Sequence, residues 1–234
     1  MERIVYARTE AELCQAVVLY CKENNIQRNS QLHYLLHRVA LELWGKLHRT
    51  YTAPCSLLQF RQNKFDLVVA DPPWPNNTKW VLSPYGSYPR MSIGAISALP
   101  VSEVVNERAL LLVWTCSMYL QETINIIQQW GFRFNGWAFI WLKLQNGKPR
   151  GSYTNTWYPC KACEIVLMGI RGKPPKSVKY ILDIIVAERR AHSQKPQEFW
   201  DKLSEWLGDD QYENKLDMFS REKREGWTVW GNQV

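Results

Sequence analysis

Long hydrophobic runs are missing from this sequence of 234 residues. No apolar stretch approaches the roughly 20 residues that a helix needs to cross a bilayer. The opening residues, MERIVYARTEAEL, lack the apolar core of a secretory signal peptide. Internal repeats and low-complexity segments are missing as well. These absences argue against membrane, secreted and fibrous proteins, so we expect a globular intracellular protein without a membrane partner.

Cysteine is sparse and scattered, at positions 14, 21, 55, 116, 160 and 163. A chain of this size does not need disulfides, so we expect free thiols. Cys160 and Cys163 form a CxxC pair, but a structural zinc site usually takes two such pairs, and there is no second one. His33 and His37 have a metal-like spacing without a third ligand in view. The sequence therefore predicts no metal site.

Positive charge is in excess, because 29 Lys and Arg face 22 Asp and Glu and give a net charge of +7. This balance favours a polyanionic partner such as nucleic acid, although only weakly. Three basic clusters stand out, each also compatible with an ordinary solvated surface: Arg189, Arg190 and Lys195; Arg221, Lys223 and Arg224; and Arg171, Lys173, Lys176 and Lys179.

Two helices are predicted at the start of the chain. Thr9 and Glu12 have the spacing of a capping box, and a periodic apolar run follows to about Tyr20. Ser30 can cap a second helix, in which apolar residues at 32, 35, 36, 39, 43 and 47 follow helical spacing. We therefore expect a small N-terminal helical annex at residues 1–55 and a larger domain at residues 56–234.

Short apolar strands alternate with helices in the larger domain. We expect strands at residues 65–70, 110–114, 139–142, 165–169, 181–186, 215–219 and 228–230, and helices at 118–130 and 196–207. This alternation predicts an α/β fold with helices on both faces of a sheet. Ligands bind such sheets at the carboxyl ends of strands. Asp71 and the segment after Phe219 follow two of these strands.

The stretch FDLVVADPPW at residues 65–74 has the pattern of a chemical site. Two prolines stiffen the backbone and push Asp71 to extended geometry. A carboxylate and a proline carbonyl can each accept one N–H of the exocyclic amine of adenine, which frees the nitrogen lone pair to attack a methyl sulfonium. Trp74 can stack on a flipped base. A rigid turn without chemistry also fits, but the position directly after a hydrophobic strand favours a site.

Further motifs follow in a fixed order: SYPRMS at 87–92, ALPV at 98–101, LLVW at 111–114, WGF at 130–132, FIWLK at 139–143, Glu164 before RG at 171–172, HSQKP at 192–196, LDMFSR at 216–221, GW at 226–227 and WGNQ at 230–233. With DPPW, this series resembles the MT-A70-like adenine-N6 methyltransferases, and most closely their short microbial members. The resemblance covers residues 60–234 and leaves the annex unmatched.

The resemblance implies roles for individual residues. Tyr88 is similar to a tyrosine that packs near the target base, Glu164 to an acid lining the base pocket, and Lys195 to a lysine near the methionine part of the cofactor. The implied catalytic residues are Asp71, Pro72, Pro73 and Trp74; the substrate-binding residues are Tyr88, Glu164 and Lys195; and the cofactor-binding residues are Asp71, Lys195, Phe219, Arg221, Asn232 and Gln233.

The fold implied by the resemblance is the Rossmann-like sheet of class I methyltransferases, with S-adenosylmethionine as cofactor. The implied reaction is methyl transfer to the exocyclic amine of adenine in nucleic acid, with DNA favoured and RNA as the alternative. A homodimer, or a heterodimer with a homologous subunit, stays open. The expected compartment is the cytoplasm in a microbe and the nucleus in a eukaryote.

Two readings of another kind also stay open. The chain could be a non-catalytic, nucleic-acid-binding subunit of a methyltransferase complex, although such subunits typically lose the acidic motif. It could also methylate a protein glutamine or another planar amide, since related four-residue motifs serve those substrates. No glycine-rich GxGxxG loop occurs anywhere, and the family tolerates this absence because its cofactor loop follows DPPW. The role of Cys160 and Cys163 is open.

Overall fold

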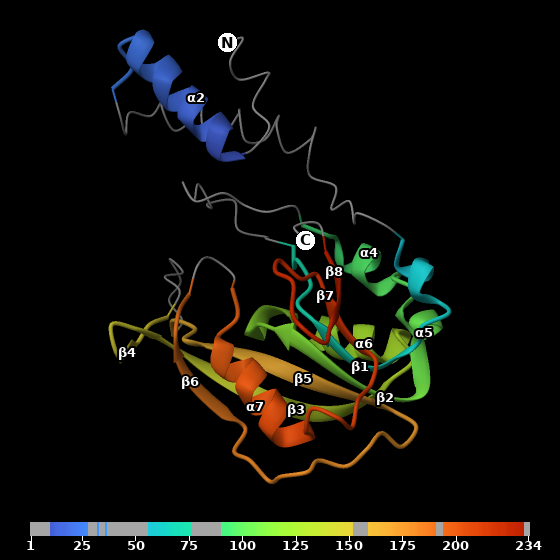
Figure 1. Ribbon diagram of the computed structural model, residues 1–234. Helices are drawn as coiled ribbons and strands as arrows, with labels where there is room; N and C mark the ends of the chain where they lie inside the picture. Colours follow the sequence, from blue (N-terminus) through green and yellow to red (C-terminus); the bar gives the residue numbers. More distant parts are fainter. Residues whose placement is uncertain are drawn as a thin grey trace. The chain divides into compact units, whose positions relative to one another are not determined.

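The computed structural model describes residues 10–27, 32, 36, 56–75, 90–151, 159–190 and 194–231. It divides into two compact units, Met1–Tyr51 with Pro75–Met91, and Thr52–Trp74 with Ser92–Val234. The described part of the first unit is mainly α2 (Glu10–Glu23), which confirms the first helix (Figure 1). The cap at Thr9, most of the second helix and the boundary at residue 55 lie outside the described residues. Nowhere in the described chain is a helix long and apolar enough to span a membrane.

Eight strands of the second unit form one mixed sheet, in the order β4-β3-β5-β2-β1-β7-β8 with β6 paired to β3. The strands β8, β7, β1 and β2 are parallel neighbours, whereas β5 runs antiparallel to both β2 and β3. Their bounds are β1 Phe65–Ala70, β2 Val105–Thr115, β3 Arg133–Gln145, β4 Lys148–Pro149, β5 Cys163–Arg171, β6 Ile184–Glu188, β7 Lys215–Met218 and β8 Thr228–Trp230.

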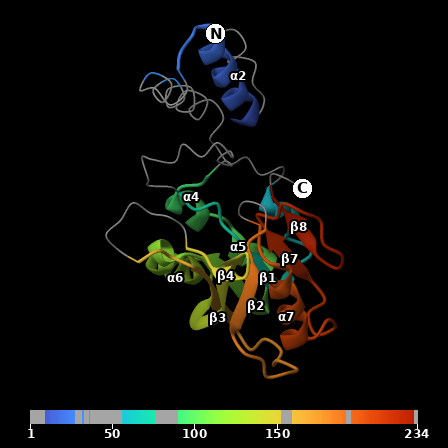
Figure 2. The same ribbon diagram turned by 90° about the vertical axis from the view of Figure 1, so that its left-hand side faces the viewer.

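Helices cover both faces of this sheet, as the sequence predicts. Figure 2 shows α6 (Leu120–Gln129) and α7 (Gln197–Leu207) on opposite sides of the strands. On the α7 side, Phe199, Leu203 and Leu207 repeat every four residues and pack on a core that includes Trp114 and Trp141. The two helices therefore enclose the central strands between them.

The α6 side of the sheet depends on a glycine. Gly169 in β5 pairs with Leu111 in β2, and a Cβ at Gly169 would lie 2.8 Å from Ile127 of α6 and 3.0 Å from Phe132. The helix can therefore pack directly on the strands. The remaining elements are short: η1 (Leu57–Phe60), α4 (Ile93–Ser97), α5 (Val101–Val104) and η2 (Ser117–Tyr119).

All seven expected strands and both expected helices of the larger domain are confirmed; β1 and β8 have the expected ends, and the other elements differ at one or both ends. β2 begins at Val105 rather than at residue 110. The predicted strand was too short because Asn106, Glu107 and Arg108, near the start of β2, are polar and do not belong to the apolar run. β3 begins at Arg133 rather than at residue 139, and its first half alternates between exposed and partly buried residues. Backbone pairing of Arg133, Phe134 and Trp137 with β5 holds the first half of β3 in the sheet. The predicted fold class, α/β with helices on both faces, is confirmed.

Candidate active site

Asp71 lies directly after β1, at the edge of the sheet where the parallel strands end. Its backbone N–H donates to the carbonyl of Met218 in β7, with 3.3 Å between the two atoms. One residue further, the carbonyl of Pro72 accepts the N–H of Trp74 at 2.8 Å. Pro72 and Pro73 are both buried. The chain is therefore fixed on both sides of the Asp71 carboxylate.

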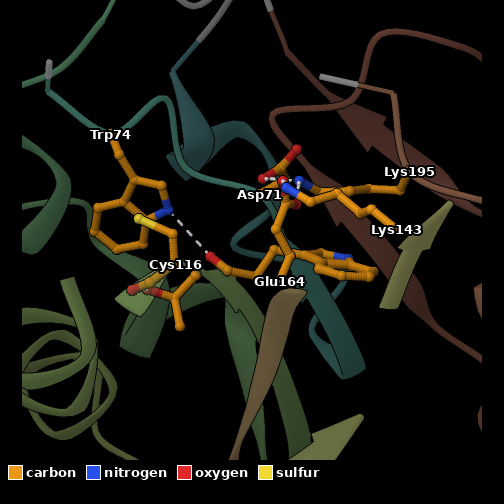
Figure 3. Close-up of polar contacts among 8 residues, drawn as sticks. Asp71, Trp74, Cys116, Lys143, Glu164 and Lys195 are labelled. Carbon is orange, nitrogen blue, oxygen red and sulfur yellow. Dashed lines mark hydrogen bonds and ion pairs between the residues drawn. The ribbon is translucent and has the colours of Figure 1, made fainter. Parts of the chain in front are cut away.

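Trp74 is held by two other elements of the sheet. Its Nε1 donates to the backbone carbonyl of Trp114 in β2 at 3.1 Å (Figure 3). Its ring stacks on Tyr119 at the end of η2, with 5.3 Å between ring centroids and 14° between planes. The indole is thus a fixed aromatic surface a few residues from Asp71.

Four charged side chains from four segments meet at this edge. Lys195, just before α7, places Nζ 3.0 Å from Asp71 Oδ1 and 2.8 Å from Glu164 Oε2. Glu164 in β5 receives a second lysine, Lys143 in β3, at 3.1 Å from Oε1. Figure 3 shows both lysines pointing towards the carboxylates. The four side chains form a row, Asp71–Lys195–Glu164–Lys143, in which negative and positive charges alternate. The side chain of Lys195 is only 13% exposed and that of Lys143 only 8%.

Burial and charge act on these groups in opposite directions. Burial alone would raise the pKa of Glu164, but Lys195 and Lys143 together outweigh it and hold that pKa at about 2. Burial raises the pKa of Asp71, helped by the negative charge of Glu164 and opposed by Lys195 and Arg221. Burial alone would lower the pKa of Lys195, yet Asp71 and Glu164 raise it above its ordinary value. Lys195 is therefore a cation and Glu164 an anion throughout the neutral range.

The turn after β7 lies against the end of β8. Phe219 has a positive φ of 65° and packs edge-on against Trp230, with 5.3 Å between ring centroids. The N–H groups of Phe219 and Ser220 both donate to the carbonyl of Trp230. A Cβ at Gly231 would lie 2.1 Å from the carbonyl oxygen of Ser220, so only glycine fits there. We call this contact of Phe219 and Ser220 with Trp230 and Gly231 the seam. Arg221, the next residue in the turn, lies close enough to lower the pKa of Asp71.

Asp217 is a buried acid that the sequence analysis missed. It lies in β7 beneath the turn and accepts the Ser220 hydroxyl at 2.8 Å. Burial raises its pKa to about 7, and Asp71 and Glu222 add to this against Ser220 and Arg224. The available signal was an acid inside the strand KLDM. Lys143 was missed in the same way, although it ends the apolar stretch FIWL.

The structure brings together many, but not all, of the residues singled out from the sequence. Asp71 and Glu164 both contact Lys195, and Trp74 lies in the same segment as Asp71. Tyr88, Asn232 and Gln233 fall outside the described residues, so their roles stay predictions. Cys160 and Cys163 are exposed free thiols just before Glu164. Within the described ranges, no three His, Cys, Asp or Glu side chains are grouped so that they could hold a metal ion.

The donor set of this edge fits the amino-acid end of S-adenosylmethionine. That end carries an ammonium and a carboxylate, which match the Asp71 carboxylate and the Lys195 ammonium in charge. An ammonium has three N–H donors, and the two carboxylates use two of those of Lys195. Close packing of Gly231 on the backbone of Ser220 fixes the turn that carries Arg221.

Comparison with known proteins agrees with this site. The MT-A70 family model matches residues 65–233. Type II methyltransferase M.MunI from Mycoplasma sp is 23% identical over 197 residues, which cover 75% of this chain and 80% of that protein. The N(6)-adenosine-methyltransferase MT-A70-like protein of Arabidopsis thaliana is 28% identical over 77% of this chain but only 26% of its own length. The human N(6)-adenine-specific methyltransferase METTL4 is 24% identical over 76% of this chain and 39% of its own.

Since the family model spans most of the sequence, the chain belongs to the MT-A70 family. Its sheet is accordingly a Rossmann-like methyltransferase fold, and its class is that of the adenine-N6 methyltransferases. The chain covers most of the microbial relative, but only about a quarter of the plant one.

Proposed function

We propose that this chain transfers the methyl group of S-adenosylmethionine to the exocyclic amine of an adenine in DNA. The observation that carries the proposal is the fixed Asp71 carboxylate at the end of β1, beside Trp74 and in contact with Lys195. DNA is favoured because the chain matches a short microbial methyltransferase over 80% of its length. The relative named as an adenosine methyltransferase is much longer.

Asp71 and the adjacent proline carbonyls act on the amine. The carbonyl of Pro72 already accepts the Trp74 N–H, but a carbonyl has a second lone pair. With one N–H on Asp71 and one on a proline carbonyl, the nitrogen lone pair is aimed at the methyl group. The new N–C bond forms as the S–C bond breaks, and the methylated nitrogen then loses a proton to Asp71 or to water. Catalysis rests on positioning and local charge.

The remaining residues hold the two reactants. S-adenosylmethionine, when bound, supplies the electrophilic methyl group. Lys195 pairs with its carboxylate and Asp71 with its ammonium, while Phe219, Arg221, Asn232 and Gln233 border its adenosine part. Trp74 and Tyr88 pack near the target base, and Glu164 lines the base pocket. These assignments are supported by the contacts of Asp71, Glu164 and Lys195 and by the family match.

Methyl transfer from labelled S-adenosylmethionine tests this function. Matched single-stranded DNA, duplex DNA and RNA oligomers would be compared, each with and without adenine. We expect incorporation into DNA, and a loss of about 100-fold or more in kcat for Asp71→Asn because the neutral side chain no longer accepts the amine N–H as an anion. The matched control is Asp210→Asn, an exposed acid outside the site, which should leave the rate unchanged.

The outcomes separate the alternatives. Incorporation into RNA alone would replace DNA as the substrate. Cofactor binding without incorporation into any polymer would point to a missing partner subunit. No cofactor binding at all would overturn the proposal and favour a non-catalytic, nucleic-acid-binding subunit.

A further inference from the structure

Lys143 is a buried cation next to the proposed active site. It lies near the end of β3 and is 6% exposed. Its backbone is fixed on both sides, because its N–H donates to the carbonyl of Ala162 and its carbonyl accepts the N–H of Arg150, both at 2.9 Å. Its Nζ lies 5.9 Å from the centre of the Trp141 ring. A lysine in such a place has little freedom to reach other partners.

Burying an ammonium is unfavourable unless an anion compensates it. Within the described chain, Glu164 is the one carboxylate that pairs with Lys143. The two oxygens of Glu164 are divided between two cations, since Oε1 accepts Lys143 and Oε2 accepts Lys195. Glu164 is therefore held by a cation that itself has no contact with Asp71.

The sharing of Glu164 between two lysines affects the position of the Lys195 ammonium. Lys195 is shared between Glu164 at 2.8 Å and Asp71 at 3.0 Å. With Lys143 present, the charge of Glu164 is already balanced on its other oxygen. Without Lys143, the negative charge of Glu164 would be balanced by Lys195 alone. Glu164 would then attract Lys195 more strongly and draw it away from Asp71.

We propose that Lys143 is a positioning residue for methyl transfer: by anchoring Glu164 it keeps Lys195 in contact with Asp71. The inference rests on the proposed function, in which Asp71 must be ionised to accept the amine N–H. The charges that act on Asp71 come from three further segments. They are Lys195 before α7, Glu164 in β5, and Asp217 with Arg221 in β7 and its turn.

The test replaces Lys143 with methionine, which keeps the length and removes the charge, and with arginine, which keeps the charge. For Lys143→Met we expect the acid limb of the kcat/KM profile to move up by about one pH unit. The loss of activity should be largest on the acid limb of the profile and small on its plateau. Lys143→Arg should restore most of the profile. Lys148→Met, an exposed lysine in β4, is the matched control and should leave it unchanged.

A second readout does not need activity. The Asp71 carboxyl would be titrated by carbon NMR in protein labelled at aspartate, with the signal assigned by its absence in Asp71→Asn. The titration midpoint should move up in Lys143→Met. In a Glu164→Gln background, removal of the Lys143 charge should hardly move it, because the coupling runs through Glu164. This double variant also serves if Lys143→Met alone does not fold.

Different failures are distinguishable. A wild-type protein that neither binds S-adenosylmethionine nor methylates any polymer would overturn the proposed function, while the NMR titration would still test the role of Lys143. An equal loss of activity at every pH, with an unmoved Asp71 titration, would overturn the positioning role. The same holds if the midpoint moves equally with and without Glu164.

Discussion

At the level of single residues, Trp74 is fixed through both its ring and its N–H. Trp74→Phe keeps a flat ring on Tyr119 but removes the hydrogen bond to the Trp114 carbonyl. Loss of one such bond costs about 1 kcal/mol, so we expect Tm to fall by about 2–4 °C. We also expect kcat/KM to fall several-fold, because the ring is less well oriented. Thermal melts and the methyl-transfer assay measure both effects.

Trp137→Phe is a matched control for this change. Trp137 is an exposed tryptophan in β3 whose Nε1 donates to Asp183 at 2.9 Å, so the same substitution removes the same kind of bond away from the site. Its activity should stay at the wild-type level. If both variants lose activity alike, Trp74 has no special place in the reaction.

Asp217 gives a second prediction at this scale, on stability and pH. The Ser220 hydroxyl lies 2.8 Å from both Asp217 Oδ2 and the Glu222 carbonyl, but it has one hydrogen. The single Ser220 hydrogen is therefore shared between two acceptors, so it only partly compensates the burial of an ionised Asp217 carboxylate. This agrees with the raised pKa of about 7.

The sign of the effect follows from that raised pKa. The unfolded chain releases the Asp217 proton near pH 4 and the folded chain near pH 7. Stability should therefore fall as pH rises from about 4 to about 7 and then level off. Asp217→Asn should remove this fall, with a gain in unfolding free energy of about 2–4 kcal/mol above pH 7. Denaturant unfolding from pH 4 to pH 8 measures it, and Asp210→Asn should show no such gain.

At the level of elements, the seam between the β7 turn and β8 depends on Gly231. Gly231→Ala would force a Cβ against the Ser220 carbonyl and push Phe219 and Arg221 out of place. We expect weaker binding of S-adenosylmethionine by about tenfold, measured by calorimetry, together with a lower Tm. In Gly94→Ala, at an open position of α4, no atom lies within 4 Å of the new Cβ. Equal binding by both variants would contradict a cofactor role for the seam.

The sequence predicts the strands and helices of the larger domain because each has a local signature. Thus β1 is apolar apart from Asp66, and α7 repeats its apolar residues every four positions. The pairing of the strands has no such local signal. The ion pair of Lys143 with Glu164 exists because β3 lies beside β5, in a register that sets Trp141 opposite Glu164.

The seam after β7 was beyond sequence reasoning for the same reason. Arg221 and Phe219 could be placed after a strand, but not against Trp230, since that contact depends on β8 lying next to β7. Asp217 is an acid inside a predicted strand, and the sequence alone does not show that it is buried. Burial beneath its own turn, through Ser220, is a property of the folded loop.

At the level of the whole molecule, the net charge of +7 should contribute to the affinity for nucleic acid. Affinity for a charged polymer falls with salt because bound counterions are released. We expect the dissociation constant for an oligonucleotide to rise about tenfold or more between 50 and 200 mM salt. Fluorescence anisotropy with one oligomer across a salt series measures the slope. An affinity that is independent of salt would show that the excess charge takes no part in binding.

The place of β1 in the sheet also has a consequence for how the protein is made. β1 pairs with β2, which follows it closely in the chain, and with β7, which follows about 150 residues later, as the bond between Asn214 and Asp66 shows. A growing chain therefore carries one open edge of its central strand until β7 has been synthesised, and such edges favour aggregation. An unfinished chain that stops after α7 would contain Asp71, Glu164 and Lys195, but not the strand that holds the backbone of Asp71. Folding is expected to be slow and to finish late, so the site is assembled last.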